Sequence, residues 1–188
     1  WSRGEELVSD RFPEVASASA RLPEGTVLDG ELIVFKERVL SFAVLQTRIG
    51  RKKLTPRILA EVPVAFMAYD LLEADGIDFR SHPLAERRAR LESLMVGAPS
   101  AFQVSPLVAG ATWEDLAAAR QEARERNVEG LMLKRLVSPY LTGRKRGDWW
   151  KWKIEPFTFD GVLLYAHPGH GKRASLFTDY TFAVWDAG

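Results

Sequence analysis

Two acidic residues interrupt the apolar segment Leu-Asp-Gly-Glu-Leu-Ile-Val at 28–34. Alternate residues of a strand point to the same face of a sheet, so Asp29 and Glu31 should lie side by side. The segment Val-Glu-Gly-Leu-Met-Leu-Lys at 128–134 repeats this pattern with Glu129. A charge inside apolar structure requires a compensating partner or ligand. These carboxylates could hold a hard divalent cation, which prefers oxygen ligands.

Basic and aromatic residues occur in two further apolar segments. In Trp-Trp-Lys-Trp-Lys-Ile at 149–154, alternation places Lys151 and Lys153 on one face of a strand. The segment Phe-Met-Ala-Tyr-Asp-Leu-Leu starts at Phe66 and contains Tyr69. Paired lysines, a cation site and an aromatic ring able to stack on a base are the parts needed to bind a nucleotide and stabilise phosphoryl transfer.

Each segment alone has a simpler explanation. An Asp-Gly-Glu sequence is most often a turn with solvated acids. Two lysines on one face are usually the wet side of an amphipathic strand, and aromatic residues are usually part of a core. The four segments together favour a shared site, because independent explanations would otherwise have to hold at four places.

The composition excludes several classes of protein. The 188 residues are 46% hydrophobic, which is enough for a substantial core. With 26 basic and 25 acidic residues, no uniform field attracts nucleic acid or membrane, so any basic surface must be local. The absence of cysteine excludes disulfides and thiolate metal sites, and three scattered histidines cannot build a His-rich metal site. No apolar run approaches the roughly 20 residues that span a bilayer, and no signal peptide is visible, so we expect a cytoplasmic protein.

The charged segments alternate with helical patterns. We expect strands at 26–35, 62–72, 101–104, 130–136 and 149–154. We expect helices after Ser41, at 84–95 and at 113–126, the last capped by Thr112. From residue 157 the sequence alternates without a helical pattern. These patterns predict an α+β domain at 1–155 and the beginning of a second, all-β domain at 156–188.

The ordered segments resemble the covalent nucleotidyltransferase superfamily and, within it, the bacterial ATP-dependent DNA ligases. The resemblance covers nearly the whole chain. The matching motifs are Ser2-Arg3-Gly4-Glu5 (motif Ia), 28–31 (III), 66–72 (IIIa), 129–134 (IV) and 150–153 (V). Residues 42–48 and 138–153 are also similar. The stretch 165–186 resembles the first strands of a ligase OB domain, which favours DNA ligases over RNA ligases and capping enzymes.

The resemblance implies an ATP-grasp-like adenylation domain of antiparallel sheets with flanking helices, followed by the start of the β-barrel OB domain. It implies ATP as the AMP donor, Mg²⁺ or Mn²⁺ as the metal, and nicked double-stranded DNA as the partner of a monomeric enzyme. Glu31 would contact the AMP ribose or a metal-bound water, and Glu129 would help hold the metal. Lys151 and Lys153 would grip the α-phosphate.

The resemblance also implies roles for an aromatic residue and an arginine. Phe66 would stack on adenine, with Tyr69 as the second candidate, and Arg3 would reach the ribose or the DNA 5′-phosphate. The family's nucleophilic lysine precedes motif Ia, whereas the first lysine of this chain is Lys36. Motif VI would follow Gly188. We therefore expect this chain to be a piece of a longer enzyme that does not self-adenylate alone.

Two local basic clusters are candidates for contact with duplex DNA. The first contains Arg48, Arg51, Lys52, Lys53 and Arg57, and the second contains Arg144, Lys145 and Arg146. Two alternatives to a DNA ligase stay open at this point. One is an RNA ligase or capping-type nucleotidyltransferase, and the other is a non-catalytic nucleic-acid-binding module.

Overall fold

The computed structural model describes residues 1–2, 4–51, 53–143, 145–156 and 158–186. The chain divides into two compact units, Trp1–Ile154 and Glu155–Gly188, one residue before the boundary that the sequence predicts. In the described part of the chain, no helix has the length and apolar character needed to cross a membrane.

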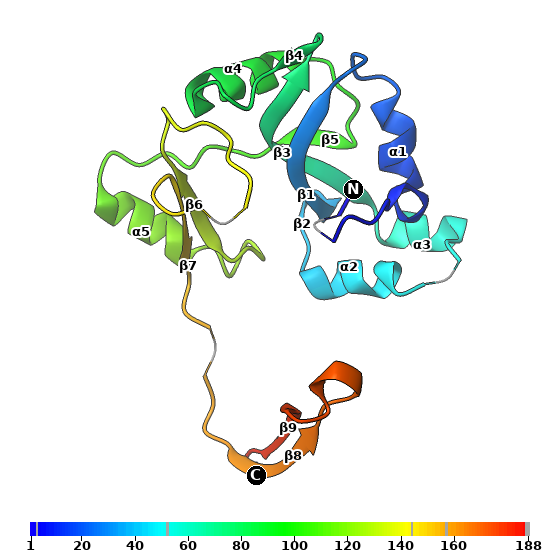
Figure 1. Ribbon diagram of the computed structural model, residues 1–188, viewed down its shortest axis with the longest axis vertical. Helices are drawn as coiled ribbons and strands as arrows, with labels where there is room; N and C mark the ends of the chain where they lie inside the picture. The colour runs from blue at the N-terminus through cyan, green and yellow to red at the C-terminus, as the bar shows by residue number, and fades with distance from the viewer. Residues whose placement is uncertain (3, 52, 144, 157, 187–188) are drawn as a thin grey trace. The chain divides into compact units, whose positions relative to one another are not determined.

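A mainly antiparallel sheet forms the centre of the first unit (Figure 1). Its strands are β1 (Val27–Lys36), β2 (Arg38–Val39), β3 (Val64–Ala74), β4 (Ile77–Asp78) and β5 (Phe102–Val104). The order is β2-β1-β3-β4, and β5 pairs with β3. The β3–β5 pair is parallel, whereas the sequence resemblance implied antiparallel sheets.

The pairing of β1 with β3 contains a β-bulge. Asp29 lies opposite Asp70, but the next residue of β1, Gly30, lies opposite Ala68. Tyr69 is therefore an additional residue on β3. A bulge of this kind re-aims the side chains around it, and it separates Tyr69 from the simple alternation that begins at Phe66.

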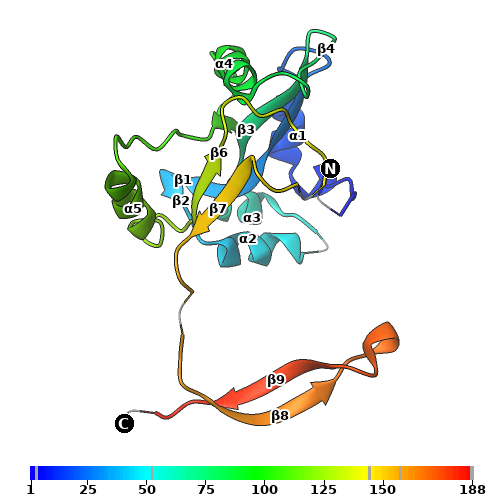
Figure 2. The ribbon, with the colours of Figure 1, turned by 60° about the vertical axis from the view of Figure 1, so that its left-hand side comes forward.

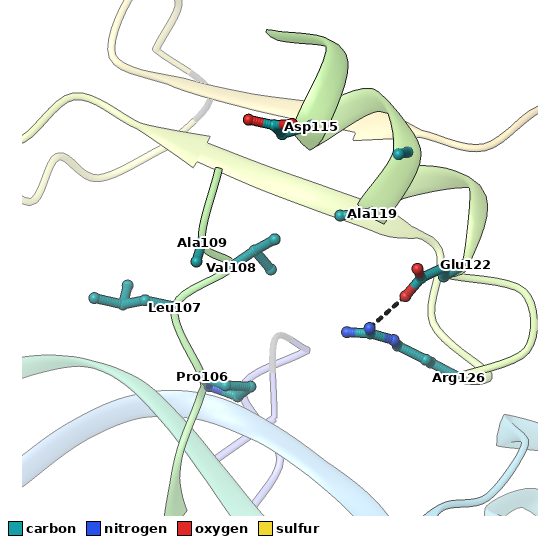
Figure 3. A pocket seen from close by; sticks show the side chains of 9 residues that line it. Pro106, Leu107, Val108, Ala109, Asp115, Ala119, Glu122 and Arg126 are labelled. Carbon is teal, nitrogen blue, oxygen red and sulfur yellow. Dashed lines mark hydrogen bonds and ion pairs between the residues drawn. The ribbon is translucent and has the colours of Figure 1, made fainter. Parts of the chain in front are cut away.

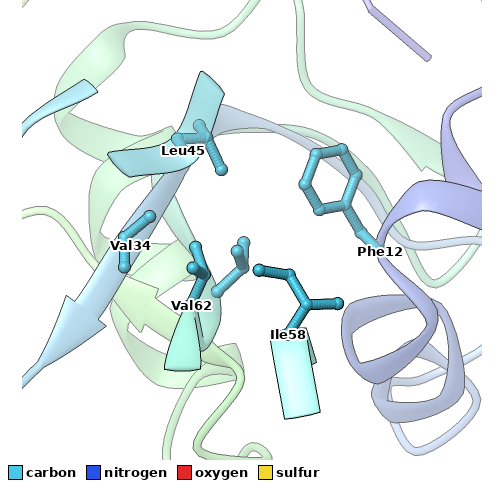
Figure 4. Packing of buried hydrophobic residues seen from close by; sticks show 6 residues of the cluster. Phe12, Val34, Leu45, Ile58 and Val62 are labelled. Carbon is cyan, nitrogen blue, oxygen red and sulfur yellow. The ribbon is translucent and has the colours of Figure 1, made fainter. Parts of the chain in front are cut away.

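The core covers one face of the sheet in two clusters. Helices α1 (Pro13–Ser19), α2 (Phe42–Ile49) and α3 (Pro56–Glu61) contribute to the first cluster together with the turn η1 (Ser9–Arg11). Figure 4 shows five of its residues, Phe12, Val34, Leu45, Ile58 and Val62. Helix α4 (Leu84–Leu94) covers the second cluster, which is built around Leu71 and Leu91.

The two shortest of these helices were not expected from the sequence. Helix α1 has seven residues and α3 has six, too few to show an apolar stripe. Each begins with a proline in its first turn, Pro13 and Pro56, where the missing N–H costs nothing. Helix α2 begins after Ser41, as predicted.

A two-stranded antiparallel hairpin, β6 (Gly130–Lys134) and β7 (Trp149–Lys153), completes the first unit. Helix α5 (Trp113–Gln121) lies on the far side of this hairpin from β1 and β3 (Figure 1), and Figure 2 shows the two strands of the hairpin side by side. Thr112 caps α5 through a reciprocal pair of hydrogen bonds with Asp115. The helix ends before residue 126 because 122–127 form turns, which end at Asn127 with a φ of 56°.

The second unit is an antiparallel hairpin of β8 (Val162–Pro168) and β9 (Phe177–Ala183). A short turn, η2 (Gly171–Arg173), connects the strands at the Pro-Gly-His-Gly segment of residues 168–171. At least half of the surface of Leu163, Tyr165 and Phe182 is exposed. The described hairpin therefore does not enclose a core.

Candidate active site

The β6–β7 hairpin turns one of its faces toward β3. The ammonium nitrogen of Lys134 lies 4.6 Å from the centre of the Tyr69 ring and 3.9 Å from a ring of Trp149. In the hairpin register, Lys134 pairs with Trp149 and Met132 pairs with Lys151. Paired residues share a face, so the face that meets Tyr69 also carries Lys151 and, one pair further, Lys153.

The opposite face of the hairpin packs under α5. The ring of Trp152 lies 5.9 Å from that of Trp113, and the Arg120 guanidinium lies 4.8 Å from the Trp152 ring. Arg120 also donates a hydrogen bond to the carbonyl of Lys153. The prediction that the two lysines share a face opposite Trp152 is confirmed by this register.

Glu129 and Lys153 form an ion pair at the end of this hairpin. Lys153 Nζ lies 2.6 Å from Glu129 Oε2, and the two side chains are 52% and 74% exposed. The hydrogen bond and charge of Lys153 lower the pKa of the Glu129 carboxyl, and Lys151 adds a smaller contribution. Three of the four predicted charged residues therefore act on one another.

The glycine after Glu129 is required by close packing. Gly130 has a φ of +135°, and a Cβ at this position would lie 2.3 Å from the carbonyl oxygen of Trp152. A side chain here would strain the backbone and push β7 away. Gly130 therefore lets β6 begin directly beside Lys153, where Glu129 can reach the lysine.

On the facing sheet, Asp29 accepts hydrogen bonds from two tyrosines. The Tyr140 hydroxyl donates to Asp29 Oδ2 at 2.8 Å, and the Tyr69 hydroxyl donates to Oδ1 at 3.3 Å. Burial, with the nearby Asp29 charge, raises the pKa of both tyrosines. Asp29 thus orients aromatic rings, while Glu31 on the same face is exposed and also raises the Tyr69 pKa.

The structure separates the two aromatic candidates. Phe66 lies opposite Leu32, and its ring lies so close to Gly30 that a Cβ there would clash with it. Phe66 also contacts Phe102 at a ring distance of 5.8 Å and packs against the second core cluster. Tyr69 instead lies with Asp29 on the face that meets the hairpin. The bulge, which the sequence pattern does not reveal, produces this difference.

Sequence reasoning missed Lys134 and Tyr140 as site residues. The sequence places Lys134 at the far end of its strand from Glu129, yet this end of β6 meets Tyr69. Burial lowers the Lys134 pKa, although the charges of Asp70 and Asp29 oppose that shift. Strand alternation places Lys134 on the same face of β6 as Met132, and this was the signal in the sequence for its position. The partner of Tyr140 lies 111 residues away and gives no local signal.

One predicted DNA contact is wrong. Arg48 is 1% exposed, because its guanidinium is held in the interior by Glu14 at 2.5 and 2.7 Å and by the carbonyls of Arg11 and Val62. Burial alone would raise the Glu14 pKa, but the hydrogen bonds and charge of Arg48 outweigh it and leave the pKa lowered. Arg48 therefore connects α2 with η1, with α1 and with the end of α3.

The remaining basic candidates are exposed or undescribed. Arg57 forms an exposed ion pair with Glu61. Arg51, Lys53, Lys145 and Arg146 are also exposed. Three candidates lie outside the described residues, namely Arg3, Lys52 and Arg144.

The residues that the structure describes contain no cluster of three or more His, Cys, Asp or Glu side chains arranged for a metal ion. Glu129 already pairs with Lys153. The described side chains therefore do not form a complete metal site. Magnesium is usually bound by one or two carboxylates together with substrate phosphates, so this donor set fits a metal that arrives with a nucleotide.

A hollow of about 380 Å³ lies elsewhere, between α5 and the segment 106–109 (Figure 3). Leu107 and Val108 line one side, and the ion-paired Glu122 and Arg126 line the other. None of the predicted site residues lines this hollow.

Comparison with known proteins places this geometry in a family. The family model for the ATP dependent DNA ligase domain matches residues 1–153. A probable DNA ligase from Opitutus terrae is 37% identical over 99% of this chain and 21% of the relative. One from Koribacter versatilis is 35% identical over 98% of this chain and 36% of the relative. The chain thus spans about a fifth and about a third of these two proteins.

Solved structures give the same result. Mycobacterial DNA ligase D complexed with ATP and MES is 31% identical, with a TM-score of 0.60 over 79% of this chain and 44% of that chain. A Lig E DNA ligase shares the fold, with a TM-score of 0.63 over 89% of this chain and 60% of that chain at 23% identity. The chain belongs to the family of ATP-dependent DNA ligase domains.

Proposed function

We propose that the first unit is the nucleotide-binding part of an enzyme that uses ATP to seal nicks in double-stranded DNA. One observation carries the proposal: the hairpin face with Lys151 and Lys153 meets the sheet face that carries Asp29 and Glu31. Cations and carboxylates on two facing sheets fit a polyphosphate with its metal. The ATP in the DNA ligase D complex supports the choice of nucleotide.

The resemblance implies three chemical steps. A lysine amine attacks the α-phosphorus of ATP, forms a phosphoramidate with AMP and releases pyrophosphate. The 5′-phosphate at a nick then takes the AMP from the lysine. The 3′-hydroxyl attacks this activated phosphate, forms the phosphodiester and releases AMP.

In each step charge moves onto phosphate oxygens, and Lys151 and Lys153 would stabilise that charge. Both are exposed lysines on the inner face of β7. Lys153 already pairs with Glu129, so a bound phosphate would share this lysine with the carboxylate. Fixed cations act here without reorganisation during the reaction.

Tyr69 is the residue that we propose to stack on adenine, in place of Phe66. Its ring is anchored through its hydroxyl to Asp29 and lies on the face that meets the hairpin. The ring of Phe66 instead packs against Gly30 and Phe102. A ring fixed in this way loses little conformational freedom when a base stacks on it.

Magnesium would be held by Glu31 or Glu129 together with the nucleotide phosphates. The metal would supply charge neutralisation and Lewis acidity to the phosphoryl group. The protein residues hold the nucleotide and place the lysines against its α-phosphate.

We also propose that the second unit begins an OB domain. Its hairpin carries apolar residues that are exposed in the described part of the chain, as expected for strands that contribute to a barrel.

Duplex DNA would contact the exposed Arg51, Lys53, Lys145 and Arg146. We propose a monomeric enzyme that acts in the bacterial cytoplasm.

The decisive experiment uses the full-length protein with ATP, Mg²⁺ and a nicked DNA duplex. Intact-mass spectrometry should show one covalent AMP, and electrophoresis should show the sealed strand. An adduct from GTP in place of ATP would indicate a capping-type enzyme, and sealing of RNA alone would indicate an RNA ligase. DNA binding without any adduct would leave a non-catalytic module and refute the proposal.

A further inference from the structure

Lys134 is an ammonium enclosed by aromatic rings. Its nitrogen is 3.9 Å from a ring of Trp149 on β7 and 4.6 Å from the ring of Tyr69 on β3. The nitrogen is buried, and no group of the described residues accepts a hydrogen bond from it. An arrangement of this kind is a cation–π contact with two partners.

The position of Lys134 costs stability, so packing alone does not explain it. A buried ammonium loses its hydration, and without a hydrogen-bond acceptor it recovers that loss only in part. An apolar side chain of similar length would fill the same space without this cost. Residues that cost stability in this way are frequent where a site must be held in one arrangement.

The two rings belong to different sheets. Tyr69 belongs to the β1–β3 sheet, and its hydroxyl is fixed by Asp29, which Tyr140 also holds. Trp149 belongs to the hairpin, and its indole N–H donates to the Ser138 hydroxyl at 3.2 Å. Lys134 contacts the face of the Tyr69 ring while Asp29 holds its edge. These contacts leave the ring little freedom to turn.

We propose that Lys134 is a positioning residue for the nucleotide site. Its ammonium holds the Tyr69 ring at the orientation that stacks on the base. The inference rests on the proposed function, because Tyr69 is there the ring that meets adenine. Lys134 acts through Tyr69 and does not itself take part in the transfer of AMP.

The test compares Lys134→Met with Lys134→Arg in the full-length protein, by the rate of AMP adduct formation at varied ATP. Lys134→Met keeps the length of the side chain and removes the charge, so the KM for ATP should rise about tenfold while kcat changes less than about threefold. Lys134→Arg keeps a cation over both rings and should restore most of the difference. Because KM does not depend on the fraction of folded enzyme, partial misfolding would not imitate this result.

A double-mutant cycle with Tyr69→Leu decides whether Lys134 acts through the ring. In the Tyr69→Leu background, Lys134→Met should change the KM by less than about twofold. An equal rise of KM in both backgrounds would overturn the proposal, as would a fall in kcat with an unchanged KM. Lys36→Met is the matched control at the exposed end of β1 and should behave as the wild type.

The wild-type reaction separates this inference from the proposed function. If the wild type forms no AMP adduct, the proposed function fails. If the wild type reacts and Lys134→Met reacts with the same KM, only the role of Lys134 fails. The melting temperature of Lys134→Met should not be lower than that of the wild type, whereas a purely structural lysine would give a clear decrease.

Discussion

Two ion pairs in the first unit use similar groups in opposite surroundings. Arg87 and Asp70 are both 0% exposed, with two hydrogen bonds between them at 2.7 and 3.0 Å. Arg87 also donates to the carbonyls of His82 and Ser138. Lys153 and Glu129 share one contact of 2.6 Å, and more than half of each side chain is exposed.

The difference separates a structural pair from an adaptable one. Each guanidinium nitrogen of Arg87 donates at least one hydrogen bond, and these bonds connect α4, β3 and the chain after β6, which leads to Tyr140. Such a buried pair cannot exchange partners without leaving a buried charge. Lys153 and Glu129 can exchange partners, because water replaces whatever they lose. A site that accepts phosphate and metal needs this second kind of pair, supported by the first.

The largest expected effect comes from breaking the buried pair. Arg87→Met leaves the Asp70 charge buried and uncompensated, which should lower the free energy of unfolding by about 3 to 5 kcal/mol. Arg90→Met is the control on the same helix, because Arg90 pairs with Asp75 at the surface, and it should cost under about 1 kcal/mol. Urea denaturation measures both. Equal losses would contradict the distinction between the two pairs.

Removing the exposed charged residues of the hairpin should slow AMP transfer and leave the melting temperature unchanged. In the full-length enzyme, Lys151→Ala and Glu129→Ala should each slow AMP transfer at least about a hundredfold, since they remove charge stabilisation from the transition state. Glu122→Ala, which removes an exposed ion pair just after α5, is the control. Single-turnover kinetics and melting curves give the two readouts. Near-normal sealing by both variants would refute the role of this face.

Exposed cations outside the β6–β7 hairpin should have a smaller effect, on the binding of duplex DNA. Replacing Arg51 and Lys53 by alanine should weaken duplex binding, and each lost phosphate contact should reduce the slope of log K against log salt by about 0.9. AMP transfer to the enzyme should stay unchanged. Binding titrations at several salt concentrations, with Arg21→Ala as the control, measure the slope. An unchanged slope would exclude this cluster from the DNA surface.

The smallest expected effect is on the pH dependence of stability. Lys153 lowers the folded-state pKa of Glu129, so the stabilisation by Glu129 is present above the unfolded-state pKa near 4.5 and is lost as the pH falls through the lower folded-state value. Because both groups are exposed, Glu129→Gln should cost under about 1 kcal/mol at neutral pH. The unfolding curves of variant and wild type should converge in acid. A constant difference down to pH 3 would contradict this assignment.

Strand alternation and helix caps predicted much of the first unit. Ser41 and Thr112 begin helices as expected, and the face shared by Lys151 and Lys153 follows from alternation. Local patterns of this kind survive folding because each residue's neighbours along the chain determine them. The ends of α5 and the short helices α1 and α3 depend on tertiary packing and could not be predicted.

The errors in the candidate site have specific physical causes. Arg48 looked like a surface cation, but it lies three residues after the buried Leu45 on the same helix face. Its partner Glu14 is 34 residues away, so the sequence shows no pair. The resemblance ranked Phe66 before Tyr69 as the ring that stacks on adenine, whereas we propose Tyr69 because the structure places it on the face that meets the hairpin. The extra residue in that strand changes the assignment.

That extra residue makes β3 sensitive to deletion. Between the pairs Val34–Val64 and Asp29–Asp70, β1 has six residues and β3 has seven. Removing one residue near position 69 would restore regular alternation and invert the face of every residue on one side of the deletion. Asp70 could then no longer face Arg87 while Ala68 stays in the core. Amino-acid replacements at neighbouring positions should therefore be tolerated far better than a change in the length of this strand.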